Sequence, residues 1–295
     1  MWSLNYSVKY LHLFANLSQS FGGPNMLRFN ANLTTMYGGL PVTKAIAAAK
    51  ADGFASVEFR SPFGEPVELI AETLSRLDMT LVQFNTPMGD FAAGERGLAC
   101  IPGREDEFRA SIELTLEYAS ILRPLQINCP AGIASTDVPQ ADQERLLARN
   151  LEWASERLAA LDIRLQLEGI NPVDTPGVLV GTAADAMRII EMAGHDNLWL
   201  QYDFYHNQVV CGDLVQTFER YRERINHVQF ADHPGRHEPG TGEINYPFVM
   251  SELERLGYSG WVGLEYVPTG IVADGLGWLE TYRAEALGGR RVGLA

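Results

Sequence analysis

The sequence predicts a single-domain α/β fold, a (β/α)8 or TIM barrel, and three observations support this prediction. From Met26 onward, short apolar runs rich in β-branched and aromatic residues alternate with longer stretches of helical periodicity. The alternation repeats eight times before residue 287, as a closed parallel barrel requires. No G-x-G-x-x-G follows the first apolar run, although an open dinucleotide-binding sheet typically carries this phosphate-binding sequence there.

The eight apolar runs are expected to form parallel strands, because helical crossovers join strands in that orientation. In chain order they are LRFNAN (27–32), ASVEFR (55–60), TLVQFN (80–85), LQINCP (125–130), RLQLEGI (164–170), LWLQYDF (198–204), HVQFAD (227–232) and GWVGLEYV (260–267). The helical patterns that follow them cover residues 41–53, 67–78, 106–122, 140–162, 182–194, 212–225, 246–257 and 275–287.

Residues 1–25 stand outside this pattern. Their apolar stretch is short, is interrupted by His12 and follows a single lysine, whereas a signal peptide has a basic start and a longer apolar segment. The run MLRFNANL enters the first strand directly at Met26. We therefore expect a barrel domain at residues 26–295, preceded by a poorly ordered N-terminal extension.

Composition excludes several classes of function. The formal net charge of −14 argues against a nucleic-acid partner, which would require clustered Lys and Arg. No apolar run reaches the roughly 18 residues of a membrane span. The three cysteines are far apart, which favours neither a disulfide framework nor a zinc site and fits a reducing cytoplasm. An anionic ligand would have to meet local arginines.

The last four predicted strands end in side chains that can bind a metal ion or transfer a proton. They are Glu168, Asp203, Gln229 and Glu265, and each lies about one strand-helix unit after the one before. The carboxyl ends of barrel strands converge on the reactive face. One oxygen ligand from each of four consecutive strands therefore points toward a common centre.

The cost of burying these groups favours a metal site. A carboxylate at a buried strand end loses hydration worth several kcal/mol unless a partner restores it, and three such carboxylates repel one another. A divalent cation removes both problems, and oxygen ligands suit Mg2+ or Mn2+. The alternative is that each acid pairs with an arginine or caps a helix. That is the usual role of a single strand-end acid, but four in register favour the metal.

Other residues near the predicted barrel mouth are candidates for substrate binding. His206 follows Asp203 by three positions, Arg236 lies in the loop after the seventh strand, and Glu58 ends the second strand. Arg96 lies in a loop after the third strand that is about twenty residues long, too long for a plain connection. That loop is expected to be a lid or a subunit contact, which leaves a homo-oligomer open.

The sequence resembles the hydroxypyruvate isomerases of the xylose isomerase-like barrel superfamily. The resemblance runs from about Met26 to the final helix, and its most specific stretches are QLEGIN, YDFYH, HVQFADHPGRHEPGTGEINY, GLEYVP and NTPMGDFAAGERGLACIPGREDEFR. It implies that Glu168 and Glu265 bind the metal and act as the acid/base pair, that Asp203 is a ligand, and that His206 and Arg236 hold the substrate. Related sugar epimerases have a histidine where this chain has Gln229, so metal binding is expected to be looser.

The predicted function is interconversion of hydroxypyruvate and tartronate semialdehyde through an enediolate, with a small anionic keto or hydroxy acid as the partner. Two carboxylates flanking the substrate can carry the proton between adjacent carbons while a cation stabilises the intermediate. A 2-oxo-tetronate isomerase or another small sugar-acid isomerase or epimerase is the nearest alternative. A metal-dependent phosphodiesterase and a catalytically silent binding module are the alternatives from other classes, and the acidic charge and four intact strand-end ligands count against them.

Overall fold

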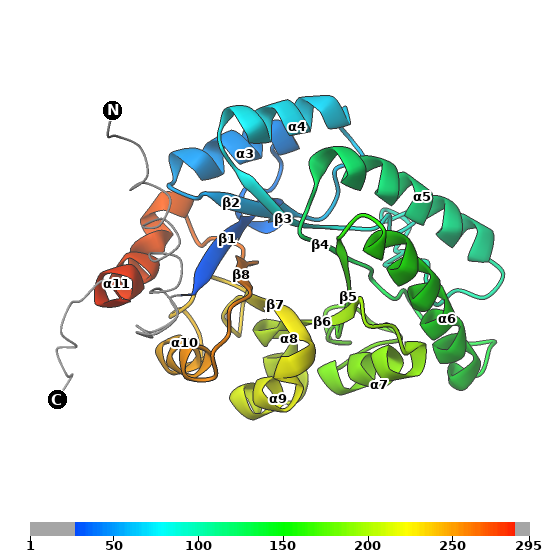
Figure 1. Ribbon diagram of the computed structural model, residues 1–295. Helices are drawn as coiled ribbons and strands as arrows, with labels where there is room; N and C mark the ends of the chain where they lie inside the picture. Colours follow the sequence, from blue (N-terminus) through cyan, green and yellow to red (C-terminus); the bar gives the residue numbers. More distant parts are fainter. Residues whose placement is uncertain (1–26, 287–295) are drawn as a thin grey trace, which may run out of the picture.

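The computed structural model describes residues 27–286 and confirms the predicted barrel. Its eight parallel strands pair in chain order, and the eighth returns to the first to close the sheet (Figure 1). They are β1 (Arg28–Asn32), β2 (Ser56–Phe59), β3 (Thr80–Asn85), β4 (Gln126–Asn128), β5 (Arg164–Glu168), β6 (Leu198–Asp203), β7 (Ile225–Phe230) and β8 (Trp261–Leu264). The extension predicted at residues 1–25 lies outside the described residues.

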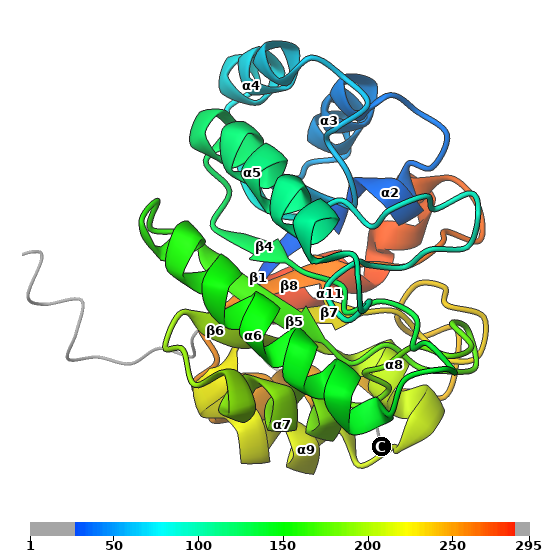
Figure 2. The ribbon, with the colours of Figure 1, turned by 90° about the vertical axis from the view of Figure 1, so that its right-hand side faces the viewer.

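The helices surround the sheet, and α5 and α6 lie side by side on its outer surface (Figures 1 and 2). The helices are α2 (Leu33–Met36), α3 (Val42–Ala51), α4 (Val67–Arg76), α5 (Glu105–Leu122), α6 (Gln140–Ala159), α7 (Ala183–Ala193), α8 (Phe204–Val210), α9 (Leu214–Tyr221), α10 (Tyr246–Arg255) and α11 (Gly277–Ala286), with 3-10 turns η1 (Arg222–Arg224) and η2 (Val272–Leu276). None of the helices in this part of the chain is long and apolar enough to cross a membrane.

Two short helices, α2 and α8, are additional to the prediction. Each begins directly after a strand, at a side chain that caps it: Asn32 Oδ1 accepts the backbone N–H of Thr34 at 3.1 Å, and Asp203 Oδ1 accepts that of Tyr205 at 2.7 Å. Such caps satisfy backbone donors that the first helical turn leaves free. The strand therefore ends at the cap, and the capping residue is held at the mouth of the barrel.

The two faces of the sheet differ in polarity. Outward-facing residues such as Val57, Ile127 and Leu167 are fully buried against the helices, so the apolar core lies between sheet and helices. The interior of a barrel is more often filled by bulky branched residues. Here it holds buried polar side chains, namely Asn30, Asn32, Glu58, Gln83, Gln126, Asn128, Gln166, Glu168, Gln201, Asp203, His227 and Gln229.

The centre of this polar interior is an ion pair between Glu58 and His227. The His227 Nε2 atom lies 2.8 Å from Glu58 Oε2, and both side chains are almost completely buried. The amides of Asn30 and Gln229 donate to the same carboxylate at 2.7 and 2.6 Å. A Cβ at position 263 would lie 2.5 Å from Glu58 Oε1, so Gly263 of β8 leaves the space that this carboxylate occupies. The interior thus compensates its buried charge internally.

Candidate active site

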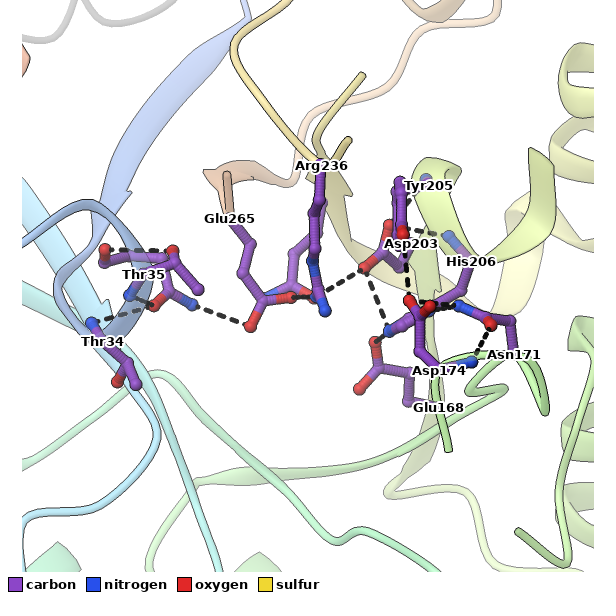
Figure 3. A network of polar contacts seen from close by, with 12 residues as sticks. Thr34, Thr35, Glu168, Asn171, Asp174, Asp203, Tyr205, His206, Arg236 and Glu265 are labelled. Carbon is purple, nitrogen blue, oxygen red and sulfur yellow. Dashed lines mark hydrogen bonds and ion pairs between the residues drawn. The ribbon is translucent and has the colours of Figure 1, made fainter. Parts of the chain in front are cut away.

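Glu168 and Asp203 bring two buried carboxylates together at the carboxyl end of the barrel (Figure 3). Glu168 Oε2 accepts a hydrogen bond from Asn128 Nδ2 at 3.1 Å, and Asp203 Oδ1 caps α8. Their other oxygens, Oε1 and Oδ2, accept no hydrogen bond from the described residues. With His206, these groups place one potential ligand atom each within 4.8 Å of one another.

The two carboxylates raise each other's proton affinity. Burial raises the pKa of Glu168 well above its ordinary value, and the nearby charges of Glu265 and Asp203 raise it further. Burial also raises the pKa of Asp203 to about 7, although Arg236 opposes that rise. Near neutral pH this pair therefore either holds a proton or requires a cation.

His206 lies near these carboxylates as a neutral imidazole, without a hydrogen bond to either. Burial lowers the pKa of His206 well below its ordinary value, and Arg236 lowers it further. The backbone N–H of Asp174 donates to Asn171 Oδ1 at 2.8 Å, which orients the amide so that Nδ2 donates to His206 Nδ1 at 2.6 Å. The proton of the neutral ring is then on Nε2, which lies 3.6 Å from Asp203 Oδ2. In this tautomer, His206 offers a proton rather than a lone pair for a metal.

Arg236 lies between Asp203 and Glu265 (Figure 3). Its Nη2 atom is 2.7 Å from Glu265 Oε2 and 3.8 Å from Asp203 Oδ2, and its guanidinium lies 5.0 Å from the centre of the Tyr205 ring. Its backbone has a φ of 57°, a left-handed conformation that is uncommon for a non-glycine residue and often marks a functional site. The backbone N–H of Val267 donates to its carbonyl at 2.8 Å, which anchors the loop.

The predicted ligands Glu265 and Gln229 occupy different surroundings. Glu265 lies at the mouth, where Asn32 Nδ2 donates to its Oε1 at 3.3 Å. Gln229 is buried, accepts a hydrogen bond from Gln201 Nε2 at 2.7 Å and donates to Glu58. The common centre of four ligands remains a prediction, since the structure groups Glu168 with Asp203 and reaches Glu265 through Arg236.

Glu58 and Arg96, the two other predicted substrate-binding residues, are at different depths. Glu58 lies beneath the mouth, and its contacts are with protein groups. Arg96 is half-buried at the rim in the long loop after β3, where it donates to the backbone carbonyls of Phe91 and Glu95 at 3.0 and 2.7 Å. Its guanidinium lies 3.8 Å from the centre of the Phe91 ring.

The donor set fits a hard divalent cation. Two carboxylates that each keep one oxygen without a hydrogen bond, and whose pKa values are raised first by burial and then by neighbouring carboxylates, are the arrangement that such an ion relieves. Glu168 and Asp203 would supply these oxygens. Glu265 lies next to them across the Arg236 side chain.

Several residues that shape the site were not among the sequence-based candidates. Asn32 and Asn128 hold the two glutamates, while Asn171 and Asp174 orient His206 and Tyr205. Asn32 and Asn128 could have been identified from the sequence. Polar residues two positions apart recur in the apolar strands, and this spacing marks the face that points into the barrel. Asn171 and Asp174 lie in an irregular loop, whose path no periodicity reveals.

Known proteins are similar to this chain over most of its length. The family described as xylose isomerase-like TIM barrel matches residues 46–282. The chain is 40% identical to hydroxypyruvate isomerase of Escherichia coli (strain K12), over 88% of this chain and all of that protein. It is 41% identical to 2-oxo-tetronate isomerase of Cupriavidus necator, over 87% of this chain and 99% of that protein. A solved structure described as AP endonuclease, family 2, from Brucella melitensis superposes with a TM-score of 0.84 at 38% identity, covering 87% of this chain and 99% of that one.

Proposed function

Because the chain belongs to the hydroxypyruvate isomerases within the xylose isomerase-like TIM barrel family, we propose that it interconverts hydroxypyruvate and tartronate semialdehyde. It is an isomerase, and relatives named for two small sugar acids define the class of substrate. The observation that carries the specific proposal is the pair of buried carboxylates, Glu168 and Asp203, facing the charged mouth that contains Glu265 and Arg236.

The reaction moves a proton between adjacent carbons. A base removes a proton from C3 of hydroxypyruvate and gives an enediolate. A proton is then returned to C2, while the hydroxyl proton passes from the oxygen on C3 to the oxygen on C2, so the atoms balance. Glu168 and Glu265 are the pair of groups that we assign to these transfers. The raised pKa of Glu168 suits a group that takes up and releases a proton during the reaction.

His206 and Arg236 are assigned to substrate oxygens. The Nε2–H of His206 can donate to a substrate oxygen, and the guanidinium of Arg236 can bind an anionic one. Glu168, Asp203, Gln229 and Glu265 are the residues that we propose hold Mg2+ or Mn2+. When bound, such an ion stabilises negative charge that develops on the two substrate oxygens.

A second substrate, 2-oxo-tetronate, is favoured by one observation. The relative named for that activity in Cupriavidus necator is as similar to this chain as the hydroxypyruvate isomerase is. The two acids differ by one carbon, which changes the length of the substrate without changing the groups that react.

Solvent exchange tests the proposal. The protein is incubated in D2O with Mg2+ or Mn2+ and either hydroxypyruvate or 2-oxo-tetronate, and deuterium at the carbons beside the carbonyl is followed by NMR. We expect incorporation and product with at least one acid, and the ratio of kcat/KM identifies the preferred chain length. Absence of exchange with both acids would contradict the proposal. Duplex DNA carrying an abasic site is incubated in parallel, and we expect no cleavage, since the net charge of −14 opposes DNA binding.

A further inference from the structure

The rim of the barrel carries two arginines without an acidic partner. Arg60 follows β2, and its guanidinium lies 4.8 Å from the centre of the Phe91 ring, on which Arg96 also stacks at 3.8 Å. Within residues 27–286, neither arginine has a carboxylate at ion-pair distance. Arg104, in the same loop as Arg96, is by contrast paired with Glu95 and Glu107. Arg104 is therefore neutralised by two carboxylates, whereas Arg96 donates only to backbone carbonyls through Nη1.

Arg60 is held where a positive charge is costly. It is half-buried, and burial lowers its pKa, while Glu265 raises it and Arg236 and Arg96 lower it further. Arg60 follows β2 and Glu265 follows β8, and both strands pair with β1, so the two residues lie at the same end of the barrel. A protein with net charge −14 that gathers cations at one rim favours an anion there.

The loop that carries Arg96 has a fixed base and an exposed tip. A Cβ on Gly97 would lie 2.2 Å from the carbonyl oxygen of Pro130, and the N–H of Cys100 donates to Ala131 at 2.9 Å, so the base packs directly on the segment after β4. The tip carries Phe91, which is 41% exposed. The stacking of this exposed ring on two guanidiniums orders the tip and connects it to the end of β2.

We propose that Arg60 and Arg96, aligned by Phe91, form the subsite that binds the carboxylate of the substrate. This inference rests on the proposed function and adds to it the group that selects acids over neutral sugars. Guanidinium binds carboxylate through two parallel hydrogen bonds. Because Arg60 and Glu265 follow the two strands that flank β1, the carbons next to a carboxylate bound at Arg60 face the part of the mouth that contains the reacting glutamate.

The test separates binding from turnover. D-glycerate, a small hydroxy acid, is titrated calorimetrically into the Mg2+-loaded wild type, Arg60→Met and Arg60→Lys. The matched control is Arg164→Met, because Arg164 stacks on Trp199 at 5.4 Å where β5 begins, at the other end of the barrel. We expect Arg60→Met to weaken glycerate binding and raise the KM for the acid substrate by about 10- to 100-fold, with kcat within about threefold. Arg60→Lys should fall between, and Arg164→Met should match the wild type.

Dihydroxyacetone, which has no carboxylate, tests whether the effect is specific for acids. The affinity of the protein for this neutral compound should not change in Arg60→Met. Arg96→Met is a second variant with the same expectation, and thermal melting followed by circular dichroism confirms that each variant is folded. Equal affinity of the wild type and both methionine variants for glycerate would overturn the subsite, even if the wild type enolises hydroxypyruvate. A wild type that enolises neither acid would instead overturn the proposed function, while the glycerate titration still reports on the arginines.

Discussion

Replacing Asp203 by asparagine is expected to stabilise the metal-free protein at pH 8. Burial raises the pKa of Asp203 from 3.8 to about 7. Since each pKa unit corresponds to about 1.4 kcal/mol, ionising this group in the folded state costs about 4 kcal/mol at pH 8. Asn keeps the oxygen that caps α8 and removes the charge. Because the proton is shared with Glu168, we expect Asp203→Asn to raise the free energy of unfolding by about 2 to 4 kcal/mol.

The pH dependence of the free energy of unfolding determines the direction of this effect. Between pH 4 and 7 the folded protein retains a proton that the unfolded chain has already lost, so the wild type loses stability as pH rises through this window. The advantage of Asp203→Asn should therefore be large at pH 8 and small near pH 4. Urea unfolding in EDTA at both pH values measures it, with the exposed acid Asp142, paired with Arg145 on α6, replaced by asparagine as the control. Equal or lower stability of Asp203→Asn at pH 8 would refute the electrostatic reasoning.

Four further substitutions test the interior and the proton transfers. Glu168→Gln and Glu265→Gln should each lower kcat by about 10²- to 10⁴-fold without loss of the folded structure; near-normal turnover in either, measured by NMR, would remove it from the mechanism. His227→Asn should cost about 3 to 5 kcal/mol in urea unfolding, because it removes the imidazole that contacts the buried carboxylate of Glu58 and lowers its pKa. Gly263→Ala should cost about 1 to 3 kcal/mol in the same assay, since the new Cβ would meet that carboxylate at 2.5 Å; an unchanged midpoint would mean that the carboxylate can move away.

The fold was predictable because short apolar runs and helical patterns alternate eight times along the chain. All eight strands were located from apolar runs, and the largest errors lie at their ends. The run LWLQYDF predicted a strand through Phe204, but the strand ends at Asp203, where the side chain caps a helix that begins at Phe204. The helix predicted at 212–225 is divided into α9 and a 3-10 turn. An apolar residue fits either a strand or a short helix, so periodicity alone cannot fix these boundaries.

The site was predictable in part. Position at a strand end brought Glu168, Asp203 and His206 into one cluster. It could not tell that Gln229 turns toward Glu58, because a strand-end position fixes where a side chain starts and not its rotamer. His227 is buried within β7, and its main contact is with Glu58, a residue from the other side of the barrel. Spacing along the chain contains no information on such cross-barrel pairs.

The division between an apolar outer layer and an amide-lined interior has a consequence for evolution and engineering. The apolar packing and the reactive groups occupy two separate sets of positions, because outward-facing strand residues pack on helices while inward-facing ones reach the mouth. Repacking the outer set can raise the melting temperature without altering the chemistry. Exchanging Gln for Glu inside keeps the shape and adds charge, so a descendant could acquire a new substrate preference while its scaffold stays the same.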